Sequence, residues 1–206
     1  MKPVVDNEFI RVLADDQNER FSVVLRGVVL SYPKLARPDA FEAGAEERYS
    51  ATFLLPSPWG GLNELKKLIK SIAKLRLGGK MPTATRMFLK RVEGSSMEGK
   101  TGDIESEWFV RAARRADFGR PQLVIGSRRL PKDGAEDEIL EHFYPGAVVD
   151  ALITPWARPN PSPMINAGLD AVRFVEHGER IGGEPVSVDD AFGITTEESD
   201  GDDIPF

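Results

Sequence analysis

Aromatic and basic residues alternate in the middle of the sequence, in a pattern that suits the binding of a single-stranded polynucleotide. In the stretch 107–115, Trp108 and Phe109 are followed by three arginines. On an ideal strand Phe109 and Arg111 would share one face, because successive side chains point to opposite faces. A base can stack on such a ring, for about 1–3 kcal/mol per base, while the cation meets a phosphate. The basic residues that we predict to contact phosphates are Lys90, Arg91, Arg111, Arg114, Arg115, Arg128 and Arg129.

The rings of such a site must be accessible to bases. An aromatic residue in a strand is more often a core residue than a binding residue. Rings close to strand ends or loops are better placed, because they can present one face to solvent and keep a polar tip. The aromatic residues that we predict to stack on bases are Tyr32, Tyr49, Phe109, Tyr144 and Trp156.

A second motif resembles the phosphate-binding loop of nucleotide-binding enzymes. Residues 94–101, GSSMEGKT, fit the pattern G-x-x-x-x-G-K-[ST]. That loop needs a preceding strand and a following helix whose first amides bind phosphate. A strand is plausible at 87–92, but Gly102 and another strand-like segment follow the motif. We therefore expect a glycine-rich hairpin loop, and we keep a nucleotide-binding enzyme acting through Lys100 and Thr101 as an alternative.

Other catalytic or metal-binding constellations are missing from the sequence. It has no cysteine, which excludes disulfides, thiolate zinc sites and a cysteine nucleophile. Its two histidines, His142 and His177, do not have the spacing of metal ligands. No G-x-S-x-G elbow is present. We therefore expect a protein without catalytic activity, cofactor or metal.

Charge is distributed unevenly along the 206 residues. The chain has 27 Lys and Arg against 33 Asp and Glu, a net charge of −6. Residues 76–132 hold 13 bases and 6 acids, whereas residues 189–206 hold seven acids and no base. This asymmetry favours an anionic partner for the body of the protein, although a solubilising surface without a partner would have the same composition.

The last twelve residues, TTEESDGDDIPF, combine acidic side chains with an apolar tip. Acidic segments of this kind are typically solvated and disordered. A free carboxylate beside a phenyl ring also suits an apolar pocket with a basic rim on a partner. The acids could instead occupy the protein's own basic groove by mimicking phosphates. The residues that we predict to bind a partner are Asp200, Asp202, Asp203 and Phe206.

These residues must be positioned mainly by strands. One amphipathic helix is predicted at 61–76, where leucines and isoleucines recur at helical spacing opposite four lysines, and Gly78 and Gly79 end it. Pro33 and Pro38 should end the first strand, and the proline-rich segment 155–163 should be a loop. The predicted strands are 21–32 (with a bulge or bend at Gly27), 48–55, 85–92, 107–113, 121–125, 146–156 and 168–175. Many short strands with one helix and long loops predict a mainly β barrel or sandwich.

The sequence contains no segment predicted to span a membrane or to act as a signal peptide. No apolar run approaches the 18 or so residues of a membrane span, and the N-terminus lacks the apolar region of a signal peptide. We therefore expect a cytoplasmic protein with no membrane partner.

Several stretches together resemble the bacteriophage single-stranded DNA-binding proteins of the Enc34 type, which are related to the T7-type phage proteins. The matching stretches, in the family's order, are VVLSYPKLARPDAF (28–41), RYSATFLLP (48–56), EWFVRAARR (107–115), RPQLV (120–124), FYPGAVVDALI (143–153) and INAGLDAVRFVEHGERIGG (165–183). The resemblance implies an OB-fold that binds single-stranded DNA without sequence preference and has no catalytic activity. Residues 1–20 have no counterpart that we can place.

From this resemblance we expect an OB-fold domain over residues 1–188, with 1–20 as a possible N-terminal extension, and a flexible acidic tail over 189–206. The expected role is to coat and protect single-stranded DNA during phage replication, recombination and repair, in the host cell cytoplasm, as a monomer or homodimer. The tail would contact a polymerase, helicase or primase and compete with DNA. A phage scaffold or adaptor that does not bind DNA, with the tail as its only binding element, is a further alternative.

Overall fold

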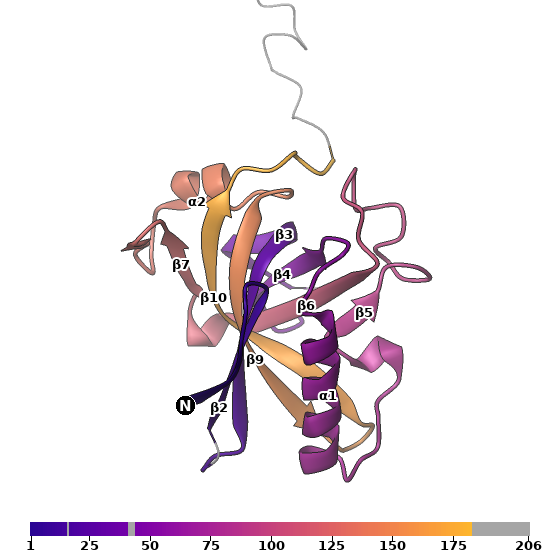
Figure 1. The fold of residues 1–206 in the computed structure, drawn as a ribbon. Coiled ribbons are helices and arrows are strands. Elements are labelled where there is room, and N and C mark those ends of the chain that lie inside the picture. The colour runs from indigo at the N-terminus through magenta and orange to yellow at the C-terminus, as the bar shows by residue number, and fades with distance from the viewer. Residues whose placement is uncertain (16, 41–43, 183–206) are drawn as a thin grey trace, which may run out of the picture.

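Five strands close a barrel in the computed structural model, which describes residues 1–15, 17–40 and 44–182 (Figure 1). Around the barrel the order is β3–β4–β6–β10–β9, and β9 returns to β3. All neighbours are antiparallel except β6 and β10. The barrel strands are β3 (Arg20–Asp39), β4 (Arg48–Leu55), β6 (Trp108–Arg115), β9 (Val148–Arg158) and β10 (Met164–Glu176). A small closed barrel of this kind is an OB-fold, which confirms the predicted fold class.

β3 can pair with both β9 and β4 because the register of its pairing shifts at three points. The first break is at Gly27, whose φ of +61° lies in the left-handed region, and the Gly27 N–H donates to Asp150 Oδ1 at 3.0 Å. This confirms the predicted bulge. The strand continues through Pro33 and Pro38, contrary to our prediction. Both prolines fall where the register with β4 shifts, so the ladder needs no N–H from them.

A third proline is also accommodated inside a strand. Pro155 was predicted to begin a loop, but β9 runs on to Arg158 and Pro155 pairs with Ala167 of β10. The pairing of β9 with β3 ends at Ile153. Beyond that point one edge of β9 is unpaired with β3, which is where a residue without an N–H is tolerated.

The predicted helix is present as α1 (Leu62–Arg76), which packs on the barrel core. It packs against β9 and β10 and buries Leu65, Leu68 and Ile69 among other apolar residues. Leu75, which the periodicity assigned to the same face, is 50% exposed. The helix ends as predicted, because Gly79 has a positive φ and its N–H reaches back to the Ala73 carbonyl at 3.0 Å.

Further elements surround the barrel, and most were not predicted. A hairpin of β1 (Lys2–Asp6) and β2 (Ile10–Asp15) pairs with β3, and Ile10 and Val12 are buried in the core. The predicted strand 85–92 is a 3-10 turn, η1 (Ala84–Arg86), followed by the shorter strand β5 (Leu89–Arg91). The remaining elements are η2 (Ala116–Phe118), β7 (Gln122–Ile125), β8 (Arg128–Arg129) and a second helix, α2 (Glu136–His142), beside β10 (Figure 1).

Two further expectations concern the chain as a whole. The acidic tail, with Asp200, Asp202, Asp203 and Phe206, lies outside the described residues. Within the described ranges no helix is long and apolar enough to span a bilayer.

Candidate nucleic-acid interface

A groove of about 740 Å³ opens on the outside of the barrel, across β3, β4, β6 and β10. Small residues on three neighbouring strands leave the space open. Ser50 of β4 lies opposite Ala113 of β6, which in turn pairs with Gly168 of β10, beside Ala167. Ser50, Ala113 and Ala167 all line the groove. A larger residue at Ser50 or Ala113, which lie opposite each other on the outer face, would narrow the groove.

Two of the predicted rings line this groove. Tyr32 is 53% exposed and Trp156 is 43% exposed, although both belong to barrel strands. Both therefore keep an open ring face, which is the requirement for stacking on a base. The chain thus brings together two residues that are 124 positions apart in the sequence.

The backbone at Tyr32 is unusual for so large a residue. Its φ of +45° lies in the left-handed region that favours glycine. It sits where the pairing of β3 with β4 breaks between Ser31 and Lys34. Such a conformation costs about 1–3 kcal/mol and is found mainly at functional sites. The bulge directs the tyrosine ring into the groove.

Four cations line the same groove. Lys90 and Arg111 were predicted as phosphate contacts. Partial burial and the positive charge of Arg111 lower the pKa of Lys90. The Arg111 guanidinium also donates to Ser96 Oγ at 2.9 Å. Two like charges so close together would be stabilised by an anion bound between them.

The other two groove cations, Lys34 and Arg48, were missed by sequence reasoning. Lys34 lies 3.0 Å from Asp39 and Arg48 lies 2.6 Å from Glu46, both as exposed ion pairs. Exposed pairs are weak, so these cations remain available to an anion. The signal available in the sequence was that each of these cations lies close to a tyrosine, in YPK and in RYS.

Arg114 and Arg115 do not line the groove. Arg114 donates to the carbonyls of Phe118 and Gly119 and lies 3.5 Å from Asp170. Arg115 forms ion pairs with acids at 2.7 and 2.8 Å. Both guanidiniums therefore fasten the end of β6 to its neighbours, and the predicted phosphate contact is not supported for them.

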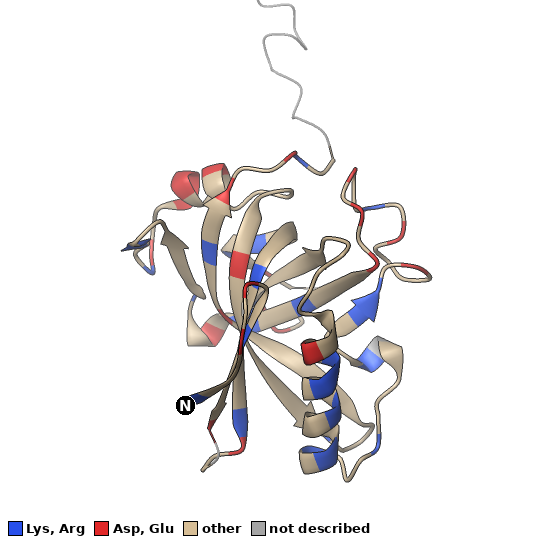
Figure 2. Ribbon diagram, in the orientation of Figure 1, with Lys and Arg blue, Asp and Glu red and all other residues tan. Residues whose placement is uncertain are grey.

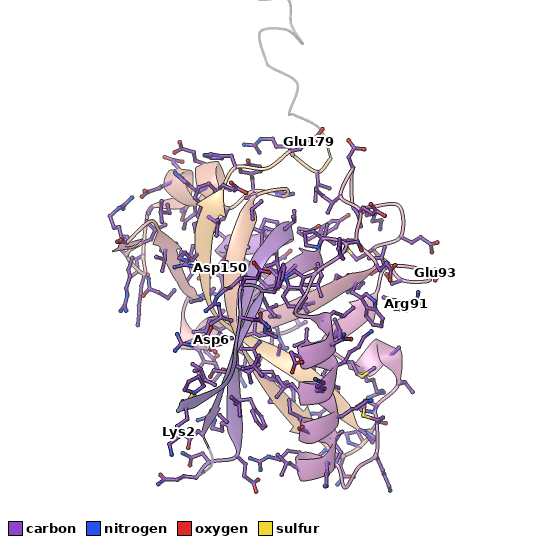
Figure 3. The ribbon with its side chains drawn as sticks, in the orientation of Figure 1. Lys2, Asp6, Arg91, Glu93, Asp150 and Glu179 are labelled. Atoms are coloured by element: carbon purple, nitrogen blue, oxygen red, sulfur yellow. The ribbon has the colours of Figure 1, made fainter. Side chains whose placement is uncertain are left out.

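Arg91, Arg128 and Arg129 also lie away from the groove lining. Arg91 is 3.6 Å from Glu93, and both residues are labelled beside β5 in Figure 3. Arg128 pairs with Glu138 of α2. Arg129 is exposed on the two-residue strand β8. The structure therefore brings together two of the seven predicted phosphate contacts.

Phe109 is fully buried and has no ring face for a base, contrary to our prediction. Its side chain does lie on the Arg111 side of β6, with the guanidinium carbon 5.4 Å from the ring centroid. However, the loop after β5 folds over it, and Met97 packs on it together with Val29 and Leu54. Strand alternation alone could not show that a loop covers the outer face.

Tyr144 and Tyr49 also lie outside the groove lining. Tyr144 is 7% exposed, and its hydroxyl donates to the Gly178 carbonyl at 2.8 Å. His177 stacks on its ring and Arg180 lies 4.0 Å from the ring centroid, so the predicted accessible ring is wrong. Tyr49 is half-buried on β4, one residue from Ser50 and therefore on the opposite face.

The glycine-rich segment 94–101 does not have the geometry of a phosphate-binding loop. In the described segment between β5 and β6 the chain forms turns, and no helix follows Thr101. The Gly94 N–H already donates to Glu98 Oε2 at 3.0 Å, and Met97 is buried. The expected glycine-rich loop is confirmed, and the arrangement of helix amides that the enzyme alternative requires is missing from this segment.

Comparison with known proteins places this geometry in a family. Residues 21–204 match the family model described as Enterobacter phage Enc34, ssDNA-binding protein. No curated protein matches the chain.

Solved structures share the fold. The single-stranded DNA-binding protein from bacteriophage Enc34, in complex with ssDNA, is 24% identical, with a TM-score of 0.69 over 87% of this chain and 97% of that one. A second structure of the same phage protein is also 24% identical, with a TM-score of 0.69 over 92% of this chain and 97% of that one. Bacteriophage T7 gp2.5, a single-stranded DNA binding protein, is 12% identical, with a TM-score of 0.51 over 87% and 97% of the two chains.

Proposed function

Since this chain belongs to the family of the Enterobacter phage Enc34 single-stranded DNA-binding protein, we propose that it binds single-stranded DNA without sequence preference. The binding site is the groove that Tyr32 and Trp156 line. The observation that carries this proposal is the coincidence of two open rings and four cations in one groove on the outside of the barrel.

Each group has a distinct role in this proposal. The rings of Tyr32 and Trp156 stack on bases, which tolerates any sequence because every base has a π-face. Arg111 and Lys90 meet the phosphates between stacked bases, with Lys34 and Arg48 extending the positive surface towards β3. A phosphate beside Lys90 and Arg111 removes the repulsion between these two cations, so binding relieves an unfavourable feature of the free protein.

We further propose that the protein coats single-stranded DNA in phage replication, recombination and repair, in the cytoplasm of the host. Residues 189–206 would contact a polymerase, helicase or primase through Phe206, and their seven acids would compete with DNA for the groove. A chain ending at Val188 should then bind a dT oligonucleotide more tightly than the full chain at low salt. Equal affinity of the two chains would contradict the competition.

The groove is tested by comparing two aromatic substitutions in a titration with a labelled dT oligonucleotide. Trp156→Ala should weaken binding by about 1–3 kcal/mol, the usual contribution of one stacked base. Phe118→Ala is the matched control, because Phe118 is 63% exposed but does not line the groove. Equal losses in the two variants would place the DNA elsewhere. Undetectable binding by the unaltered protein at low salt would refute the function and favour an adaptor.

A further inference from the structure

A row of lysines runs along the exposed side of α1. The row consists of Lys66, Lys67, Lys70 and Lys74, and Figure 2 shows the blue bands on successive turns of the helix. Glu64 is the one acidic residue in the helix sequence, and its carboxylate lies 2.7 Å from Lys67. Lys70 and Lys74 are exposed and have no ion-pair partner within the described parts of the chain.

This lysine row is unfavourable for the helix itself. Lys66, Lys70 and Lys74 are spaced four residues apart, which places neighbouring Cβ atoms about 6 Å from each other. Their ammonium groups therefore repel each other. Solvated helices typically interleave charges of both signs, which turns the same spacing into attraction. An anion that lies along the row would remove the repulsion.

The lysine row is continuous with the groove through β5. Lys66 Nζ lies 4.2 Å from the centroid of the Trp108 ring, and the Arg91 guanidinium carbon lies 5.7 Å from the same ring. Arg91 is the neighbour of Lys90, which lines the groove. On β5 these two side chains point to opposite faces, so the positive surface passes from the groove around the short strand to α1.

We propose that the lysine row is a second phosphate-binding tract, along which a single DNA strand continues after it leaves the groove past β5. The row spans about 12 Å from Lys66 to Lys74 at the helical rise of 1.5 Å per residue. This inference rests on the proposed function of the groove. A DNA strand fits the row better than an acidic protein does, because a protein interface needs an apolar centre and the row consists of ammonium groups.

The experiment compares two lengths of oligonucleotide on the full-length protein. A dT6 probe is short enough to occupy the groove alone, whereas dT30 can reach α1. In the double variant Lys70→Glu/Lys74→Glu, the affinity for dT30 at about 50 mM salt should fall at least about tenfold, and the salt slope should shrink by about 1.4, or 0.7 for each lost phosphate contact. The affinity for dT6 should change less than twofold.

Two further variants make the result specific. Lys70→Gln/Lys74→Gln removes the charges without reversing them and should show the same effect at about half the size on a logarithmic scale. Lys2→Glu/Lys132→Glu changes the net charge equally at exposed lysines outside the row and should leave both probes unaffected. Unchanged melting temperatures would show that all variants are folded.

Each other outcome overturns the proposal. Equal losses for dT6 and dT30 would mean that the lysines act through a general field. An unchanged affinity for dT30, together with lost binding of a synthetic peptide of residues 195–206, would identify an acidic protein segment as the occupant. If the unaltered protein binds neither probe, the proposed function of the groove has failed, and the tract fails with it.

Discussion

Two regions of the molecule, the surface around α2 and the part of the groove at Lys90, place their cations in different electrostatic surroundings. Around α2, arginines meet acids: Arg37 pairs with Glu136 and Arg128 pairs with Glu138. These hydrogen-bonded pairs raise the pKa of each arginine and lower the pKa of each glutamate. In the groove, by contrast, Lys90 lies beside Arg111, and burial together with that positive charge lowers its pKa.

The difference shows that the number of basic residues is a poor guide to a binding surface. The acid in an ion pair offsets part of the potential of its cation, at Lys34 and Arg48 in the groove as well as around α2, and such exposed pairs contribute little to stability. Cations placed beside other cations keep their attraction for phosphates. The decisive information is which acids the fold brings to each cation.

The largest expected effect separates the two regions by charge reversal. Arg111→Glu should weaken binding of a dT oligonucleotide by about tenfold to a hundredfold at low salt, since it replaces a phosphate contact with a repulsion. Arg128→Glu makes the same change in net charge but should alter the affinity less than twofold. Fluorescence titration over a salt series measures both. Equal effects would mean that net charge alone governs binding and would break the comparison.

A second prediction separates binding from stability at Tyr32. Tyr32→Gly should leave the melting temperature unchanged or raise it, because glycine adopts the left-handed backbone of this residue without steric strain. The same variant should lose about 1–3 kcal/mol of binding free energy through the missing ring. Calorimetry and oligonucleotide titration test the two parts. A large fall in melting temperature would show that the ring has a structural role instead.

The smallest expected effect is on the pH dependence of binding. A bound phosphate should raise the pKa of Lys90, which is lowered in the free protein. Binding therefore takes up a proton at pH values where Lys90 of the free protein has begun to lose its charge. The affinity should then fall as the pH rises, and the fall should begin below 10.5, the ordinary pKa of lysine. In Lys90→Arg this early decline should disappear. A pH profile with the same decline in both proteins would assign the titration to another group.

Local sequence was sufficient for most of the framework and insufficient for most of the site. The periodicity of 61–76 predicted α1 almost to the residue, because an amphipathic helix records its buried face in its own spacing. α2 was missed because seven residues show too little of that period. The strand ends predicted from the prolines of β3 and β9 were wrong, because whether a strand tolerates a proline depends on which of its edges is paired.

The predicted site residues divide into those that line the groove and those that other parts of the chain cover. The interleaving of aromatic and basic residues and the positions near strand ends pointed to Tyr32, Trp156, Lys90 and Arg111, which line one groove. Phe109 and Tyr144 have the same residue types and similar neighbours in the sequence, but the loop after β5 covers one and His177 with Arg180 covers the other.

The sequence by itself determined the composition of the protein: a β-rich body, one lysine-bearing helix and the separation of basic from acidic segments, all of which follow from residue type and short-range spacing. Only the tertiary structure decided which rings stay open and which acids each cation meets. Both properties depend on contacts between residues far apart in the chain, such as Glu138 with Arg128 or Met97 with Phe109. Closing the barrel sets those contacts, and no local pattern carries them.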